Sequence, residues 1–151
     1  MCGPAGSGKS TVARRLEAEG MTRLSFDHEA WRRGIRTMPL SPALSREIEQ
    51  ELQARLLSLV GDGVDVVLDF SVWSRRMRME YRDLLRPLAI VPETIYLATA
   101  RTVAIARIAT RRHGHSDDYS LPEALAAAYF DHFEPPTADE GPLCVIEHEG
   151  Q

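Results

Sequence analysis

The chain has 151 residues, of which 44% are hydrophobic and 26% charged, as expected for one globular domain with its own core. The formal net charge of −4 disfavours a dedicated nucleic-acid binder, which needs a basic surface. Two cysteines are too few for a disulfide framework, and no apolar run is long enough to span a membrane. With no signal-peptide pattern in residues 1–20, we expect a cytoplasmic protein without a membrane segment.

In chain order, short apolar strands alternate with longer helical stretches. Gly20 ends the first expected helix, and Ser41-Pro42 form an N-cap and first-turn proline for a longer one. The expected strands are 22–26, 64–70, 94–98 and 143–147, and the expected helices are 10–19, the stretch from Pro42 to Val60, 74–86, 102–112 and 122–133. Such alternation predicts a parallel sheet between helix layers, in a single domain over residues 1–151.

The motif with the clearest chemistry stands at the start of the chain. It reads Gly3-Pro4-Ala5-Gly6-Ser7-Gly8-Lys9-Ser10 and fits the phosphate-binding pattern G-x-x-x-x-G-K-[ST]. Glycines let backbone N–H groups turn toward phosphate oxygens, and the next helix points its positive end at the same place. Lys9 would bridge the β- and γ-phosphates of ATP, and Ser10 would place its hydroxyl on Mg²⁺. We count Thr11 among the nucleotide-binding residues; the alternative is a glycine-rich turn that only caps a helix.

Lysine is used only in this motif. Of the 18 basic residues, 17 are arginine, and Lys9 is the exception. A GC-rich coding sequence explains the general excess of arginine, but it does not explain why one position keeps an ammonium. A compact charge between phosphates does explain it.

The loop begins unusually close to the first residue. A phosphate-binding loop normally follows a buried strand, yet only Met1 and Cys2 precede Gly3. We therefore expect the first strand, usually central in the sheet, to be nearly absent from this sequence.

These features resemble the small P-loop kinases, such as polynucleotide 5′-kinase, gluconate kinase and chloramphenicol phosphotransferase, chains often labelled AAA-family ATPases. The resemblance covers nearly the whole chain. It implies a P-loop NTPase fold of the α/β class, with three α/β/α layers and a parallel sheet. It also implies ATP and Mg²⁺ as cofactors.

A strand that ends in an acid supplies the expected catalytic base. The segment Leu24–Asp27 places Asp27 at the carboxyl end of a parallel strand, where α/β proteins bind ligands. By resemblance to the polynucleotide-kinase group, Asp27 would accept the proton of the acceptor hydroxyl. The alternative is that Asp27 caps a helix over 28–33. The arginine that this group often carries three residues later is replaced by Ala30, so a role of Arg32 in acceptor binding stays open.

A second strand also ends in an acid. Val66–Leu68 precede Asp69 in a Walker B-like pattern, and Asp69 could hold Mg²⁺ directly or through water. Residue 70 is Phe, not the Glu that polarises water in many motor ATPases, which favours transfer to an acceptor over hydrolysis. The alternative is that Asp69 caps the next turn.

The expected lid covers residues 107–120. Arg107 and Arg111 are one helical turn apart and share a helix face. By resemblance, Arg111 would act in catalysis by neutralising charge on the transferred phosphate, and Arg107 would bind the nucleotide. The alternative is a solvated basic helix end. The segment Glu134–Pro136 resembles gluconate-kinase-like chains, where it lies near the adenine; a rigid connector is the alternative.

Two further patterns involve the tryptophans and an arginine stripe. Trp31 and Trp73 each follow an expected site acid by four residues, so they stack on a ligand ring or pack in the core. An arginine stripe on the helix 74–86 is typical of a solvated helix face, with an acceptor or RNA contact as the alternative. The stripe consists of Arg75, Arg78, Arg82 and Arg86.

The sequence thus predicts an ATP-binding phosphotransferase that moves the γ-phosphate to a hydroxyl acceptor. The acidic balance favours a small molecule over a nucleic acid, although a polynucleotide 5′-hydroxyl kinase is an alternative. Two other classes stay open: an NTPase switch without an acceptor, and a nucleotide-binding module without chemistry. The sequence makes no prediction of oligomeric state.

Overall fold

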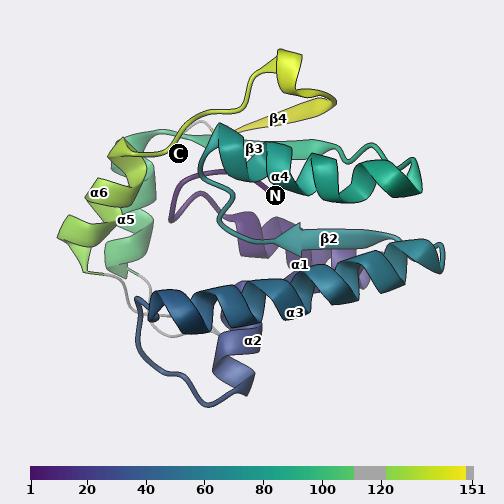
Figure 1. Cartoon of the computed structure of the whole chain (residues 1–151). Helices are drawn as coiled ribbons and strands as arrows, with labels where there is room; N and C mark the ends of the chain where they lie inside the picture. The colour runs from purple at the N-terminus through teal and green to yellow at the C-terminus, as the bar shows by residue number, and fades with distance from the viewer. Residues whose placement is uncertain (111–121, 149–151) are drawn as a thin grey trace.

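The computed structural model describes residues 1–110 and 122–148 (Figure 1). Its helices are α1 (Lys9–Ala18), α2 (Phe26–Arg32), α3 (Pro42–Gly61), α4 (Arg75–Leu85), α5 (Arg101–Thr110) and α6 (Glu123–Asp131). Its strands are β1 (Thr22–Ser25), β2 (Val66–Asp69), β3 (Thr94–Thr99) and β4 (Leu143–His148), and short 3-10 turns cover Arg86–Leu88 and Ala138–Glu140.

Serine side chains start three of the helices. Ser41 accepts a hydrogen bond from the Leu44 N–H at 3.3 Å and begins α3, as the sequence predicts. Ser74 caps α4 in the same way. Ser25 caps α2 by accepting from the His28 N–H at 3.2 Å, so Asp27 lies inside the first turn of α2. The capping role considered for Asp27 is therefore wrong.

The sheet consists of two parallel strand pairs. β1 pairs with β2, from Thr22 beside Val66 to Ser25 beside Asp69, and β3 pairs with β4. Among residues 1–110 and 122–148, Met1 and Cys2 connect the two pairs. The Cys2 N–H donates to the Ile95 carbonyl at 2.8 Å, and the Met1 amino group donates to the Leu68 carbonyl at 2.9 Å. The parallel α/β architecture is thus confirmed, with two residues in the position expected for a first strand.

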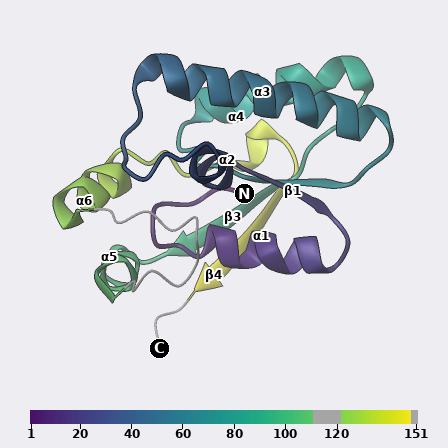
Figure 2. The same ribbon diagram turned by 90° about the horizontal axis from the view of Figure 1, so that it is seen from below.

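Helices cover both faces of the strands. Figure 2 shows α3 and α4 on one side and α1 and α5 on the other, which gives three layers. The main core lies on the side of α3, where buried side chains from β1, α2, α3 and α4 meet. This cluster contains Leu24, Ala30, Ile48, Leu52, Leu56, Phe70, Tyr81 and Leu85.

Candidate functional site

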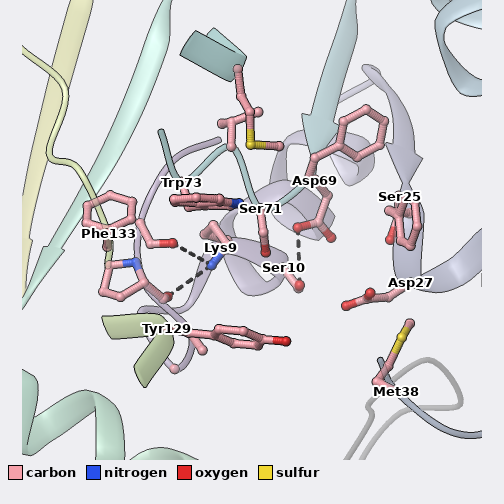
Figure 3. A pocket seen from close by; sticks show the side chains of 18 of the residues that line it. Lys9, Ser10, Ser25, Asp27, Met38, Asp69, Ser71, Trp73, Tyr129 and Phe133 are labelled. Atoms are coloured by element: carbon pink, nitrogen blue, oxygen red, sulfur yellow. Dashed lines mark hydrogen bonds between the residues drawn. The ribbon is translucent and has the colours of Figure 1, made fainter. Parts of the chain in front are cut away.

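The carboxyl ends of β1 and β2 open into one large pocket, which we call the central pocket. Parallel strands end at the same edge of a sheet, so the loops that follow them converge there. The pocket has a volume of about 860 Å³ and is lined by the Gly3–Ser10 loop, both strand ends, α3, α4 and α6 (Figure 3). The arrangement brings the predicted Lys9, Ser10, Asp27 and Asp69 into one cavity.

The backbone of the Gly3–Ser10 loop has positive φ at each of its three glycines, and Gly6 and Gly8 show what this conformation does. Gly6 has φ of +79°, and a Cβ atom there would lie 2.3 Å from the Ala104 carbonyl oxygen. Gly8 has φ of +94° and is the N-cap of α1, where side chains other than glycine are strained. The loop therefore lies against α5, and together with the N-terminus of α1 it lines the pocket, an arrangement that fits a phosphate chain.

The Lys9 ammonium points back over this loop. Its Nζ donates to the Gly3 carbonyl at 2.8 Å and to the Pro4 carbonyl at 3.0 Å. The predicted nucleotide-binding residues that line the pocket are Gly3, Pro4, Ala5, Gly6, Gly8, Lys9 and Ser10. Ser7 is fully buried with a hydroxyl that has no hydrogen-bond partner among the described residues, and Thr11 is exposed; neither lines the pocket.

Ser10 and Asp69 meet as a candidate Mg²⁺ site. The Ser10 hydroxyl donates to Asp69 Oδ1 at 3.2 Å. The other carboxylate oxygen, Oδ2, accepts from Arg23 Nε at 2.9 Å and from its Nη2 at 2.7 Å. A hydroxyl with one carboxylate is the donor set that Mg²⁺ uses beside phosphates and water, so the residues present fit this ion. Asp69 makes these side-chain bonds, and the next helix is capped by Ser74 instead.

Arg23 is a site residue that the sequence analysis missed. Its side chain is 9% exposed and that of Asp69 only 4%, so the ion pair is buried. The buried guanidinium compensates the carboxylate and fixes its orientation toward Ser10. A signal was present, because Arg23 stands two residues before the end of β1, in the strand that pairs with β2.

The acid predicted as catalytic base is exposed at the pocket. Asp27 lines it from the first turn of α2, and Figure 3 shows its carboxylate pointing toward the Ser10 side with Met38 nearby. Arg32 does not line the pocket. Its guanidinium binds the buried Glu29 at 2.7 Å, and this bond is the first cause of the lowered pKa of Glu29.

The predicted lid is described only in part. Arg107 is exposed on α5 and does not line the pocket, whereas Ile108 does. Arg111 and residues 111–120 of the lid lie outside the described residues. After them, α6 contributes Tyr129 to the pocket, and Phe133 follows just beyond that helix.

The sequence predicts that the arginine stripe on α4 is a solvated helix face. The structure contradicts this prediction for the two middle arginines. Arg78 is 3% exposed and Arg82 is 9% exposed. Arg82 donates to the Pro92 carbonyl at 2.8 Å and to the Thr94 hydroxyl at 3.0 Å. The first and last members behave as predicted: Arg75 and Arg86 are exposed and form exposed pairs with Asp139 and Asp83.

Arg78 and Arg75 also bind residues of the segment between α6 and β4. Arg78 makes two bonds to the Glu140 carboxylate, at 2.7 and 2.9 Å, and a third to the Glu134 carbonyl at 2.8 Å. Arg75 binds Asp139 at 2.7 Å. No residue of the Glu134–Pro136 segment lines the pocket. The preceding residue, Phe133, does line it, and its ring stacks on the ring of Tyr96 with 5.8 Å between the ring centroids.

Solved structures with a similar fold include kinases and a protein solved in complex with ADP-AlF3. An unliganded sugar kinase from Janibacter sp. HTCC2649 has a TM-score of 0.65 at 23% identity, covering 97% of this chain and 82% of that one. A gluconokinase from Sinorhizobium meliloti 1021 has 0.62 at 20%, covering 97% and 79%. Kti12 from Chaetomium thermophilum, in complex with ADP-AlF3, has 0.67 at 17%, covering 97% and 86%. The fold is therefore that of the P-loop kinases.

The family follows from the sequence itself. The AAA domain family matches residues 1–136, which is most of the chain, and the chain belongs to this family. No curated protein sequence matches it. Among the helices of residues 1–110 and 122–148, none is long and apolar enough to cross a membrane.

Proposed function

We propose that this protein is an ATP-dependent phosphotransferase that phosphorylates the hydroxyl group of a small molecule. The observation that carries the proposal is the convergence of Lys9, the Ser10–Asp69 pair and Asp27 in one pocket. The kinase folds of the similar structures support it.

Each residue has a role that its position allows. The Gly3–Ser10 loop and Lys9 hold the phosphates of ATP, and Ser10 with Asp69 would hold Mg²⁺, which supplies charge neutralisation on the phosphate oxygens. Asp27 accepts the proton of the acceptor hydroxyl. The acceptor oxygen forms the new P–O bond as the bond between the γ-phosphorus and the ADP oxygen breaks. We assign to Arg111 the neutralisation of charge on the transferred group, and to Arg107 a contact with the nucleotide.

The proton acceptor gives the sharpest test. We expect Asp27→Asn to lower phosphoryl transfer by at least about 100-fold, since general-base catalysis contributes about that much, while ATP binding stays unchanged. Transfer is measured with labelled ATP and a panel of hydroxyl compounds, and ATP binding by isothermal titration. Asp65→Asn, at an exposed acid just before β2, is the matched control and should behave as wild type. Wild-type turnover in Asp27→Asn would remove the assignment.

A second candidate is a nucleotide-dependent switch without an acceptor. It is favoured by the similarity to Kti12, whose structure holds ADP-AlF3. ATP hydrolysis that needs a protein partner, with no hydroxyl compound phosphorylated, would support the switch over the phosphotransferase.

A further inference from the structure

Part of the lining of the central pocket is apolar. We call it the apolar wall; it consists of Phe26, Met38, Leu40, Phe70, Met77 and Tyr81. The rings of Phe70 and Tyr81 lie 5.8 Å apart and belong to the buried core cluster. Phe26, Met38 and Leu40 pack against the same cluster. Because the wall is a face of the core, its shape is fixed before a ligand enters.

A carboxylate borders this wall. Glu49 on α3 lines the pocket, is half-buried, and accepts a long hydrogen bond of 3.5 Å from the Tyr81 hydroxyl. Burial, and then the nearby Glu49 charge, raise the pKa of Tyr81, so the phenol keeps its proton. A carboxylate accepts up to about four hydrogen bonds, which leaves room on Glu49 for a donor from a ligand.

The position of Asp27 sets how an acceptor would lie. In Figure 3, Asp27 and Met38 are on one side of Ser10 and Asp69, while Lys9 and Trp73 are on the other. An alcohol whose hydroxyl meets Asp27 would therefore have Met38, one residue of the apolar wall, beside its carbon skeleton. Arg14 and Arg23 also line the pocket, but both have partners within the chain, and Arg23 is bound to Asp69 at 2.7 Å. A carboxylate or phosphate carried by the same molecule would lie near Asp27 and Glu49, where like charges repel.

We infer that the acceptor is an alcohol with an apolar ring and a hydrogen-bond donor, an amine or a second hydroxyl, that binds Glu49. The ring replaces water on the apolar wall, and the donor pairs with a half-buried carboxylate. This inference rests on the proposed function, because it takes Asp27 as the group that meets the acceptor hydroxyl. It also sets this pocket apart from one built for a sugar acid.

Binding can be measured apart from catalysis. Trp73 is 46% exposed at the pocket, so Trp31→Phe leaves it as the single tryptophan reporter. The protein is titrated in the presence of Mg²⁺ and a non-hydrolysable ATP analogue. The probes share one skeleton: phenylalaninol has an amine, a phenylpropanediol a second hydroxyl, hydrocinnamyl alcohol neither, and phenyllactate a carboxylate. Gluconate is the anionic probe without a ring.

The expected order of affinity follows from the charges. Phenylalaninol and the phenylpropanediol should bind more tightly than hydrocinnamyl alcohol, and both anions should bind most weakly. The relative strength of the first two shows whether the donor is an amine or a hydroxyl. Tighter binding of phenyllactate or gluconate, or no binding of any ring-bearing probe, would overturn the inference.

A substitution at Glu49 tests the donor contact directly. Glu49→Gln should weaken binding of the better of the two donor probes about tenfold, the typical loss for a charge-assisted hydrogen bond. Hydrocinnamyl alcohol and the ATP analogue should bind within about twofold of their original affinities. Glu80→Gln, at an exposed residue paired with Arg76, is the control and should change nothing. Equal effects of Glu49→Gln on all ring-bearing probes would contradict a donor contact.

The two proposals fail in different ways. If the probes bind in the expected order but labelled ATP transfers phosphate to no hydroxyl compound, the phosphotransferase proposal fails and the ligand class stands. If gluconate is bound and phosphorylated while the ring-bearing alcohols are not, the proposed function stands and the ligand class is wrong.

Discussion

At the scale of single residues, Lys9 combines a fixed position with a chemistry that arginine does not copy. Its ammonium reaches the Gly3 and Pro4 carbonyls at 2.8 and 3.0 Å, within the loop itself. A guanidinium is longer and planar, so it does not fit the same compact space between loop and phosphate.

We therefore expect Lys9→Arg to lose phosphoryl transfer by about 100-fold or more, the loss typical when one preorganised charge contact is removed. ATP affinity, measured by titration calorimetry, should also fall. Arg15→Lys is the matched control on the same helix, because Arg15 is exposed and paired with Glu19. A Lys9→Arg variant with turnover near that of wild type would show that charge alone suffices at position 9.

Substitutions at Gly6 and Gly8 of the same loop distinguish the cost of backbone strain from the cost of a steric clash. Both have positive φ, but a Cβ at Gly8 meets nothing within 4 Å, whereas one at Gly6 meets the Ala104 carbonyl oxygen at 2.3 Å. We expect Gly8→Ala to lower the free energy of unfolding by about 1 kcal/mol, from strain alone. Gly6→Ala should lower it by about 3 kcal/mol, because the loop must also move away from α5. Urea unfolding without nucleotide measures both; equal losses would mean that the loop does not lie against α5.

At the scale of elements, a buried ion pair connects α4 to the segment before β4. The side chains of Arg78 and Glu140 are 2% and 3% exposed. Arg78→Met leaves the Glu140 carboxylate buried without its partner and should cost about 3 kcal/mol or more in unfolding free energy. Arg86→Ala removes an exposed arginine from the end of the same stripe and should change stability by less than about 0.5 kcal/mol. Similar losses in the two variants, measured by urea unfolding, would contradict the distinction.

The same ion pair should make the free energy of unfolding depend on pH in the acidic range. The hydrogen bonds from Arg78 are the main cause that lowers the pKa of Glu140 below its ordinary 4.5. The folded state thus holds fewer protons than the unfolded state, so the pair contributes stability above about pH 4.5 and loses it as the pH falls through the folded pKa. Glu140→Gln should therefore be less stable at neutral pH and have a shallower decline in acid. Parallel declines from about pH 6 to about pH 3 would exclude Glu140 as a source of acid sensitivity.

The sequence predicted the positions of these helices and strands well, but it did not predict the side-chain contacts between them. Ser41-Pro42 and Gly20 mark helix ends through local chemistry, and α1 and α3 occur where those residues indicate. The arginine stripe failed because Arg78 meets Glu140, 62 residues later, and a helix-face pattern contains no record of a partner so distant. Arg23 was missed for the same reason, since its contact with Asp69 depends on the pairing of β1 with β2.

At the scale of the whole molecule, the alternation of strands and helices predicted the parallel three-layer fold, because each unit must cover an apolar strand. The site followed from the fold, since parallel strands bring Asp27 and Asp69 to one edge. The apolar wall did not follow, because Met38 and Tyr81 come from segments that only tertiary packing brings together.

The candidate phosphate loop lies where the two strand pairs meet. It follows directly on Cys2, which bonds to β3, and its Ser10 binds Asp69 at the end of β2. A ligand held by this loop therefore contacts groups from both halves of the sheet and should stabilise them together.

We expect ATP with Mg²⁺ at about 100 times its dissociation constant to raise the free energy of unfolding by about 2.7 kcal/mol. For a chain of this size, the melting temperature should then rise by roughly 5–10 °C. Removing Mg²⁺ with EDTA should reduce the shift, because Ser10 and Asp69 are the residues that would hold the ion, which supplies charge neutralisation on the phosphates. Lys9→Arg should also reduce it. Hydrogen exchange shows where the stabilisation lies: slower exchange in β1, β2 and β3 together supports coupling of the two halves, and slowing confined to residues 3–18 contradicts it.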